Sequence, residues 1–277
     1  MMREALAVAR LDLGEVRRSR WVQLGAAVYA ALALVFVLAG ARESSVLQFA
    51  SMSRVLRALG QALVVIAPLV TVGATCQVVN RAREDGTLEV LFAQPLSRAG
   101  YLIGVTVTRY AVLALPALAM IAVLGLVGGA VVEGADAWRF AARAGAVTAA
   151  LIWAFTGLGL AVSVFTRNVA RAMVHGLILW ALGVALVDFA LVGAMLQWSL
   201  NPRVVFLLAA LNPVQAARLA LLAGLATDLE TLGPVGLFLA TRVGSGTLLA
   251  LGIAWPTLVG SLAWAAALGR FRRGDAV

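Results

Sequence analysis

Apolar side chains fill most of this 277-residue chain in long runs that alternate with short polar segments. A run of about 20 apolar residues can cross the roughly 30 Å hydrocarbon core of a bilayer as an α-helix. Because lipid offers the backbone no hydrogen-bond partners, each such run is expected to be helical. The pattern predicts an all-α membrane protein with six spans, at residues 21–40, 59–79, 101–132, 144–164, 172–196 and 247–268.

The first twenty residues have a different pattern, in which one apolar face repeats with helical spacing. That face holds Leu6, Ala9, Leu13 and Val16, and the charged side chains lie elsewhere around the helix. We expect residues 1–20 to form an interfacial helix in the membrane plane. The alternative is that they are only the cytoplasmic start of the first span.

Residues 197–245 are apolar but interrupted. The pair Asn212-Pro213 is typical of a helix cap followed by a first turn, and a seventh span would place the arginine-rich tail on the opposite side from the other arginines. We therefore expect a small extracytoplasmic segment of short helices, lying on the membrane or against a partner. Its candidate partner-facing residues are Asn212, Pro213, Gln215 and Arg218.

Charge placement sets the predicted orientation. Only 13% of the residues are charged and 62% are hydrophobic. The net charge of +9 comes from arginines that flank the spans, so it indicates membrane topology and no nucleic-acid partner. More than half of the arginines lie in the N-terminal segment, residues 80–100, residues 165–172 and the tail. These segments, and therefore both termini, are predicted to be cytoplasmic, and the chain is expected to form a single transmembrane domain.

Composition also excludes some chemistry. The chain has no lysine, so it has no P-loop lysine that could hold ATP phosphates. If ATP is used, another chain must hydrolyse it. A single cysteine and a single histidine provide no redox pair and no cluster of metal ligands. We therefore expect no catalytic residue, no bound metal and no cofactor in this chain.

The predicted cytoplasmic loop at residues 80–100 is unusually patterned for a simple connection. Gly86-Thr87 offers a helix start, and Glu89 falls in the first turn, where a carboxylate suits the helix dipole. Leu88, Leu91 and Phe92 share one face of this short helix. Pro95 ends it, and Ser97-Arg98 can begin the next helix. Such a helix is suited to dock on a soluble partner, although a solvated turn between spans is the plain alternative.

The stretch R-E-D-G-T-L-E-V-L-F-A-Q-P-L-S-R resembles the segment after the second span in permease subunits of the ABC type-2 exporter family. The usual form there is E-x-G-T-L-E-x-L-L-x-x-P-V-S-R, with Leu96 and Phe92 as the departures in this chain. The matching positions are Glu84, Gly86, Thr87, Leu88, Glu89, Leu91, Pro95, Ser97 and Arg98. The resemblance implies a coupling helix that sits on an ATPase subunit, with two permeases and two ATPases per transporter. ATP and magnesium would then be bound by the partner ATPase.

Two further stretches extend the likeness. F-T-R-N-V-A-R-A resembles the family's second cytoplasmic loop and contains Arg167 and Arg171. L-N-P-V-Q-A-A-R-L resembles a segment of the NosY-type branch, with Gln215 where an acid is usual. That branch works in maturation of the copper enzyme nitrous-oxide reductase, so the resemblance implies a periplasmic copper-binding companion protein.

A few isolated residues stay candidates. Asp188 is the intramembrane acid of the fifth predicted span, which makes it a candidate functional site. Arg109 is close enough to the start of the third span to extend its charge to the cytoplasmic surface. Glycines near residues 125–129 and 156–159 are expected at a homodimer seam.

Three rival functions remain open on the sequence. The chain could serve an exporter of a drug, peptide or lipid, or a stand-alone proton-coupled carrier that uses Asp188. It could also drive shape changes in a periplasmic partner without moving a solute.

Overall fold

The structure is a computed structural model that describes residues 2–43, 50–131, 136–186, 210–223 and 244–273, together with residues 193, 204 and 207 as isolated positions. Every regular element in these ranges is a helix. In chain order they are α1 (Met2–Arg18), α2 (Arg20–Glu43), α3 (Ala50–Thr75), α4 (Val78–Glu84), α5 (Thr87–Phe92), α6 (Arg98–Val131), α7 (Asp136–Phe165), α8 (Val169–Ala181), a π-helical turn η1 (Leu182–Leu186), α11 (Pro213–Leu222) and α13 (Ser245–Arg273).

Five stretches of the described chain are long and apolar enough to cross a membrane. They are Arg20–Leu38, Ala58–Glu84, Arg98–Val127, Trp138–Phe165 and Ser245–Arg273. These stretches coincide with five of the six predicted spans and confirm that those five segments are helices of sufficient length. The predicted span at 172–196 begins as α8 and continues through η1 to Leu186. Its remainder lies outside the described residues, so the sixth span stays a prediction.

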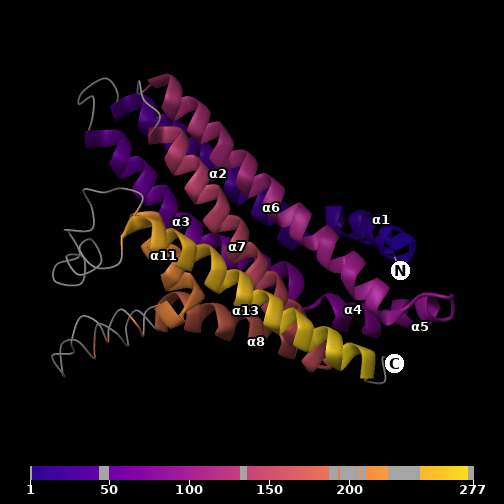
Figure 1. Ribbon diagram of the computed structural model, residues 1–277. Helices are drawn as coiled ribbons and strands as arrows, with labels where there is room; N and C mark the ends of the chain where they lie inside the picture. The colour runs from indigo at the N-terminus through magenta and orange to yellow at the C-terminus, as the bar shows by residue number, and fades with distance from the viewer. Residues whose placement is uncertain are drawn as a thin grey trace.

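The long helices run side by side, and the shorter helices α1, α4 and α5 gather at one end of them (Figure 1). In Figure 1, α1, α4 and α5 lie at the same end as the labels of both chain termini. The 80–100 segment therefore lies beside the N-terminal helix and the end of α13, as expected if all three are on one side of the membrane. We call this the loop end of the bundle.

The bundle encloses two apolar clusters. The larger one holds buried side chains of α2, α3, α6, α7 and α11 and forms the middle of the bundle. The second lies at the loop end and joins residues from α1, α4, α5, α6, α7 and α13. Its members include Val8, Leu88, Tyr101, Leu160 and Phe271. The loop helices are thus packed onto the spans through a core of their own.

Glycine lets α7 and α13 approach each other until their backbones touch. A side chain added at Gly157 would meet the backbone of Gly260, and one added at Gly159 would meet Thr75 on α3. A Cβ on Gly125 would meet Ala141 on α7. The predicted close helix contact is confirmed at these three glycines, but it lies within one chain, so they do not form a seam between two copies.

The helix α11 corrects a second expectation. Asn212 caps it, because the Asn212 side chain accepts a hydrogen bond from the Val214 N–H at 2.9 Å, and Pro213 is its first residue, as predicted. However, α11 packs against α13 and α7 rather than lying outside the bundle. Asn212 and Gln215 are buried, and Arg218 is partly buried with Nη1 3.4 Å from Gln215 Oε1. Asn212 and Gln215 therefore contact their own chain and do not face outwards to a partner.

The close approach of α7 and α13 can be tested with alanine. Gly157→Ala should destabilise the protein, because the methyl group meets backbone that cannot move aside, and overpacking typically costs about 1–3 kcal/mol. Thermal unfolding in detergent measures the effect. The control is Gly269→Ala in α13, where nothing lies within 4 Å of the added carbon. An unchanged melting temperature for Gly157→Ala would contradict the packing described here.

Candidate functional site

The turn between α4 and α5 is built as the sequence predicts. Gly86 adopts a left-handed backbone with φ of 67°, which glycine tolerates without strain. The helix α5 follows at Thr87 and ends at Phe92, and Pro95 lies just beyond it. Ser97 Oγ then accepts a hydrogen bond from the Gly100 N–H at 3.1 Å, so it caps the start of α6. The loop is a short helix with defined ends.

The apolar face of α5 is directed at its own chain. Leu88 is fully buried, while Leu91 and Phe92 are partly buried in the loop-end cluster. The Phe92 ring lies 5.9 Å from the ring of Tyr101 on α6 and 6.1 Å from that of Phe271 on α13. These three side chains of α5 therefore fix it to two spans and do not form the surface that a partner would meet.

Arg98 reinforces this attachment. Its guanidinium carbon lies 6.0 Å from the centre of the Phe92 ring, and its Nη1 lies 3.5 Å from the carbonyl oxygen of Phe271. Arg98 is also the first residue of α6. The start of α6, the end of α13 and α5 thus meet at one point.

The outward face of α5 is acidic with one apolar side chain. Glu89 and Thr87 are exposed, and Val90 is 66% exposed. Asp85 and Pro95, on either side of the helix, are exposed as well. An exposed valine among carboxylates suits a partner surface that offers an apolar pocket rimmed by positive charge.

The second loop, between α7 and α8, is hydrogen-bonded to α4. The Val79 N–H donates to Ser163 Oγ at 2.9 Å, and Asn80 Nδ2 donates to Thr166 Oγ1 at 2.8 Å. Two charged side chains add to this contact: Arg83 Nη1 donates to the Thr166 carbonyl at 3.2 Å, and Glu84 Oε1 accepts from the Val169 N–H at 3.0 Å. Arg167 and Arg171 of this loop are both exposed. The two loops that resemble family motifs therefore form one surface.

The N-terminal helix joins the same structure. Glu4 Oε2 accepts hydrogen bonds from Ser97 Oγ at 2.7 Å and from the Ser97 N–H at 3.1 Å. The bond from the Ser97 hydroxyl is the main cause that lowers the pKa of Glu4 from 4.5 to about 2. The stability from this contact is therefore present above pH 4.5 and is lost as the pH falls towards 2. At neutral pH α1 is held at the start of α6.

A buried ion pair lies deeper along α1. Arg109 Nη2 lies 2.7 Å from Asp12 Oδ1, with both side chains 5% exposed, and Arg109 Nη1 is 3.4 Å from the Ala74 carbonyl. Burial raises the pKa of Asp12, and the charge of Arg109 opposes this. The sequence suggested that Arg109 extends to the cytoplasmic surface, and this was wrong. Arg109 instead joins α1, α3 and α6. Sequence reasoning missed the pair because its partners are 97 residues apart.

The predicted apolar face of α1 is divided in the structure. Val16, which belongs to that face, is buried in the protein together with Val8 and Asp12. Leu6 and Leu13, from the predicted apolar face, are 56% and 44% exposed. They are available to contact lipid, and this contact stays a prediction.

The structure supports no functional site at the other candidate residues that it describes. Asp188 lies outside the described residues. Cys76 Sγ, in the turn between α3 and α4, lies 3.8 Å from Met173 Sδ of α8. Within the described ranges, however, no three His, Cys, Asp or Glu side chains gather as metal ligands.

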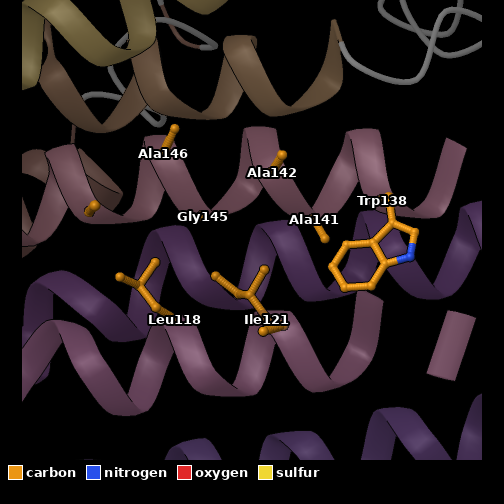
Figure 2. A pocket seen from close by; sticks show the side chains of 9 residues that line it. Leu118, Ile121, Trp138, Ala141, Ala142, Gly145 and Ala146 are labelled. Atoms are coloured by element: carbon orange, nitrogen blue, oxygen red, sulfur yellow. The ribbon is translucent and has the colours of Figure 1, made fainter. Parts of the chain in front are cut away.

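The hollow between α6 and α7 is apolar. It has a volume of about 420 Å³, and Figure 2 shows Leu118 and Ile121 on one side of it and Trp138 and Ala141 on the other. No charged side chain lines it. It therefore offers nothing that would select a polar substrate.

Comparison with known proteins points to a family. The family model described as "ABC-2 family transporter protein" matches residues 6–275. A "Probable ABC transporter permease protein NosY" of Stutzerimonas stutzeri is 26% identical over 260 residues, which cover 92% of this chain and 94% of that protein. A protein of the same name from Pseudomonas aeruginosa is 29% identical over 267 residues, covering 88% of this chain and 94% of the relative.

The buried ion pair should dominate the stability of the loop end. Asp12→Asn leaves Arg109 buried without its counter-charge, and breaking such a pair costs about 3–5 kcal/mol. Arg109→Met should be similarly harmful, because it leaves the carboxylate alone. The double variant Asp12→Asn with Arg109→Met should lose less stability than the sum of the two single losses. Thermal unfolding in detergent measures all three, and simple additivity of the two losses would show that the charges are not coupled.

Proposed function

Because this chain belongs to the ABC-2 transporter family and is a permease subunit of an ABC transporter, we propose that the outward face of α5 is the docking site of a separate ATPase subunit. The observation that supports this most directly is the division of α5 into two faces. The inward face is held by Leu88 and Phe92, and the outward face presents Glu89 and Val90. A helix fixed to the spans on one side and exposed on the other can pass on a force applied by a partner.

The attachment of α5 determines which spans would respond. Phe92 meets Tyr101 near the start of α6 and Phe271 near the end of α13. Closure of the ATPase on α5 would therefore shift the loop ends of α6 and α13 together. Glu4 and Asp12 tie α1 to α6, so α1 would move with them.

The working assembly follows from the family. Two copies of this chain would bind two ATPase subunits, and ATP with magnesium would be held by the ATPases. The absence of lysine from this chain agrees with ATP binding by a separate subunit. The loop end would face the cytoplasm, with the chain in the cell's inner membrane. Exposed Arg167 and Arg171 lie beside α4 and would add to the docking surface.

The substrate class is the finer part of the proposal. Both named relatives are NosY permeases and align over about nine-tenths of the chain. They support a role in copper-site maturation of nitrous-oxide reductase, through export or through driving a periplasmic copper-binding companion. Export of a drug, peptide or lipid is the rival. A stand-alone proton carrier is set aside, because members of this family work as subunits of ABC transporters.

The docking surface can be tested by charge reversal. Glu89→Arg should abolish co-purification of the ATPase, because it places a positive charge where the outward face of α5 is acidic. The tagged protein would be purified in mild detergent from its native host, and the ATPase identified by mass spectrometry. Arg143→Glu is the control, since it reverses a charge in the first turns of α7, away from the loop end. Equal ATPase recovery with Glu89→Arg and the wild type would argue against α5 as the docking site.

The copper role predicts a specific deficiency in the host. Deletion of the gene should leave nitrous-oxide reductase without its full copper and sulfide content, measured by metal analysis and by its visible spectrum. Complementation with the wild type should restore the content, whereas Glu89→Arg should not. A fully loaded reductase in the deletion strain would favour the drug, peptide or lipid exporter.

A further inference from the structure

The first turn of α8 is bonded to the loop that carries α5. Backbone N–H groups at a helix start lack partners within the helix. Here Asn168 accepts the N–H of Arg171, and Glu84 accepts the N–H of Val169. Glu84 is the last residue of α4, three positions before α5. Its carboxylate therefore joins α4 directly to the start of α8.

The far part of α8 is bonded to α11. The π-helical turn Leu182–Leu186 follows α8, and such turns disturb the regular backbone ladder. The carbonyl of Gly183 in this turn accepts a hydrogen bond from Asn212 Nδ2 at 2.7 Å. The other side-chain atom of the same residue, Asn212 Oδ1, accepts the N–H of Val214 and caps α11. One side chain thus joins η1 to the first turn of α11.

Between these two points the fully buried positions of α8 are small, whereas Met173, Leu179 and Trp180 are partly buried against the core. The buried residues are Ala172 and Gly176, and Gly176 lies against Val72 of α3 and against Cys76, which follows α3. Val174 and Ile178 point outwards and are 55% and 50% exposed. The contact of α8 with α3 is close, because a Cβ added at Gly176 would lie 2.7 Å from Val72 Cγ1.

Another hydrogen bond keeps α8 aligned with α3. Trp180 Nε1 donates to the Val65 carbonyl at 3.0 Å. Since α3 leads into α4, this bond ties α8 to the helix that enters the loop.

We propose that α8 transmits movement of the α4–α5 loop to α11, with Glu84 and Asn212 as the positioning residues at its two ends. The inference rests on the proposed function, in which the ATPase moves α5. It assigns Glu84 a role inside the permease rather than at the ATPase surface. It also names α11, which packs against α13 and α7, as the element that responds.

A fluorophore beside α11 can report this movement. Leu211 is 63% exposed and precedes Asn212, and its carbonyl accepts the indole N–H of Trp255 at 2.8 Å. Because the chain has one cysteine, Cys76→Ser provides a cysteine-free background. Bimane attached at Leu211→Cys would be quenched by Trp255, so its emission depends on the distance between the fluorophore and the indole ring. Trp255→Phe identifies the part of the signal that comes from this contact.

Two matched pairs of variants separate the roles at the ends of α8. Glu84→Ala removes the acceptor of the Val169 N–H, whereas Glu84→Gln keeps an acceptor oxygen without the charge. Asn212→Asp keeps the cap on Val214 but loses the N–H donor to Gly183, whereas Asn212→Ala loses both. The complex of each variant with its co-purified ATPase would be measured with and without ATP and vanadate.

The expected result is an ATP-dependent change in emission for the unmodified background that falls about fivefold or more in Glu84→Ala and in Asn212→Asp. Glu84→Gln should recover most of the change, and all these variants should still bind the ATPase. A full response in Glu84→Ala, or none in the background with ATPase bound, would overturn the role of α8 and leave the proposed function standing. Loss of ATPase binding in both Glu84 variants would instead place Glu84 at the ATPase surface. Absence of ATPase from the unmodified protein would remove both proposals.

Discussion

A protein in lipid must satisfy its own hydrogen-bonding groups, and this constraint explains where the described polar side chains lie. Threonines within the spans, such as Thr71, Thr75 and Thr156, bond back to a carbonyl four residues earlier in their own helix. These three bonds lie within single helices and do not join one helix to another. Contacts of charged side chains between different elements, such as those of Glu4, Glu84 and Arg98, lie at the loop end instead. That end can therefore be held together by groups that would be costly in the middle of the membrane.

The short length of α5 gives these contacts a mechanical consequence. A helix of six residues does not hold its shape alone, because nucleation is unfavourable and few hydrogen bonds follow it. The order of α5 comes from the burial of Leu88 and from the contacts of Phe92 with two spans. Since these residues supply the packing, the outward residues are free to be acidic. The apolar residues of the motif thus pack α5 against the spans, and its acidic residues lie on the opposite, exposed face.

The features that sequence predicted are those set by local chemistry. Span length follows from apolar runs, and the turn at Gly86, the stop at Pro95 and the cap at Asn212 follow from backbone preferences of single residues. The pairing of Asp12 with Arg109 could not be predicted in this way. An arginine near the end of a span can place its charge in water at the membrane surface, so its position does not call for a buried partner. Sequence also could not predict which face of α5 packs against the spans, since an apolar stripe has the same pattern whether it packs inwards or outwards.

The burial of α11 shows why small residues are ambiguous in a sequence. Its packing side holds Ala216 and Ala220, which meet Gly252 of α13 closely enough to leave no room for a side chain there. On a helical wheel these alanines look only weakly apolar, as on a surface helix. Because these alanines are small, the backbones of α11 and α13 can lie close together, and α11 can begin inside the bundle. This requires hydrogen-bond partners for the backbone groups at its start. Asn212 caps that start, and Trp255 binds the carbonyl just before it. These hydrogen bonds hold the start of α11 in place within the bundle. They are few and directional, so a shift of η1 relative to α11 must break or bend the bond from Asn212 to Gly183.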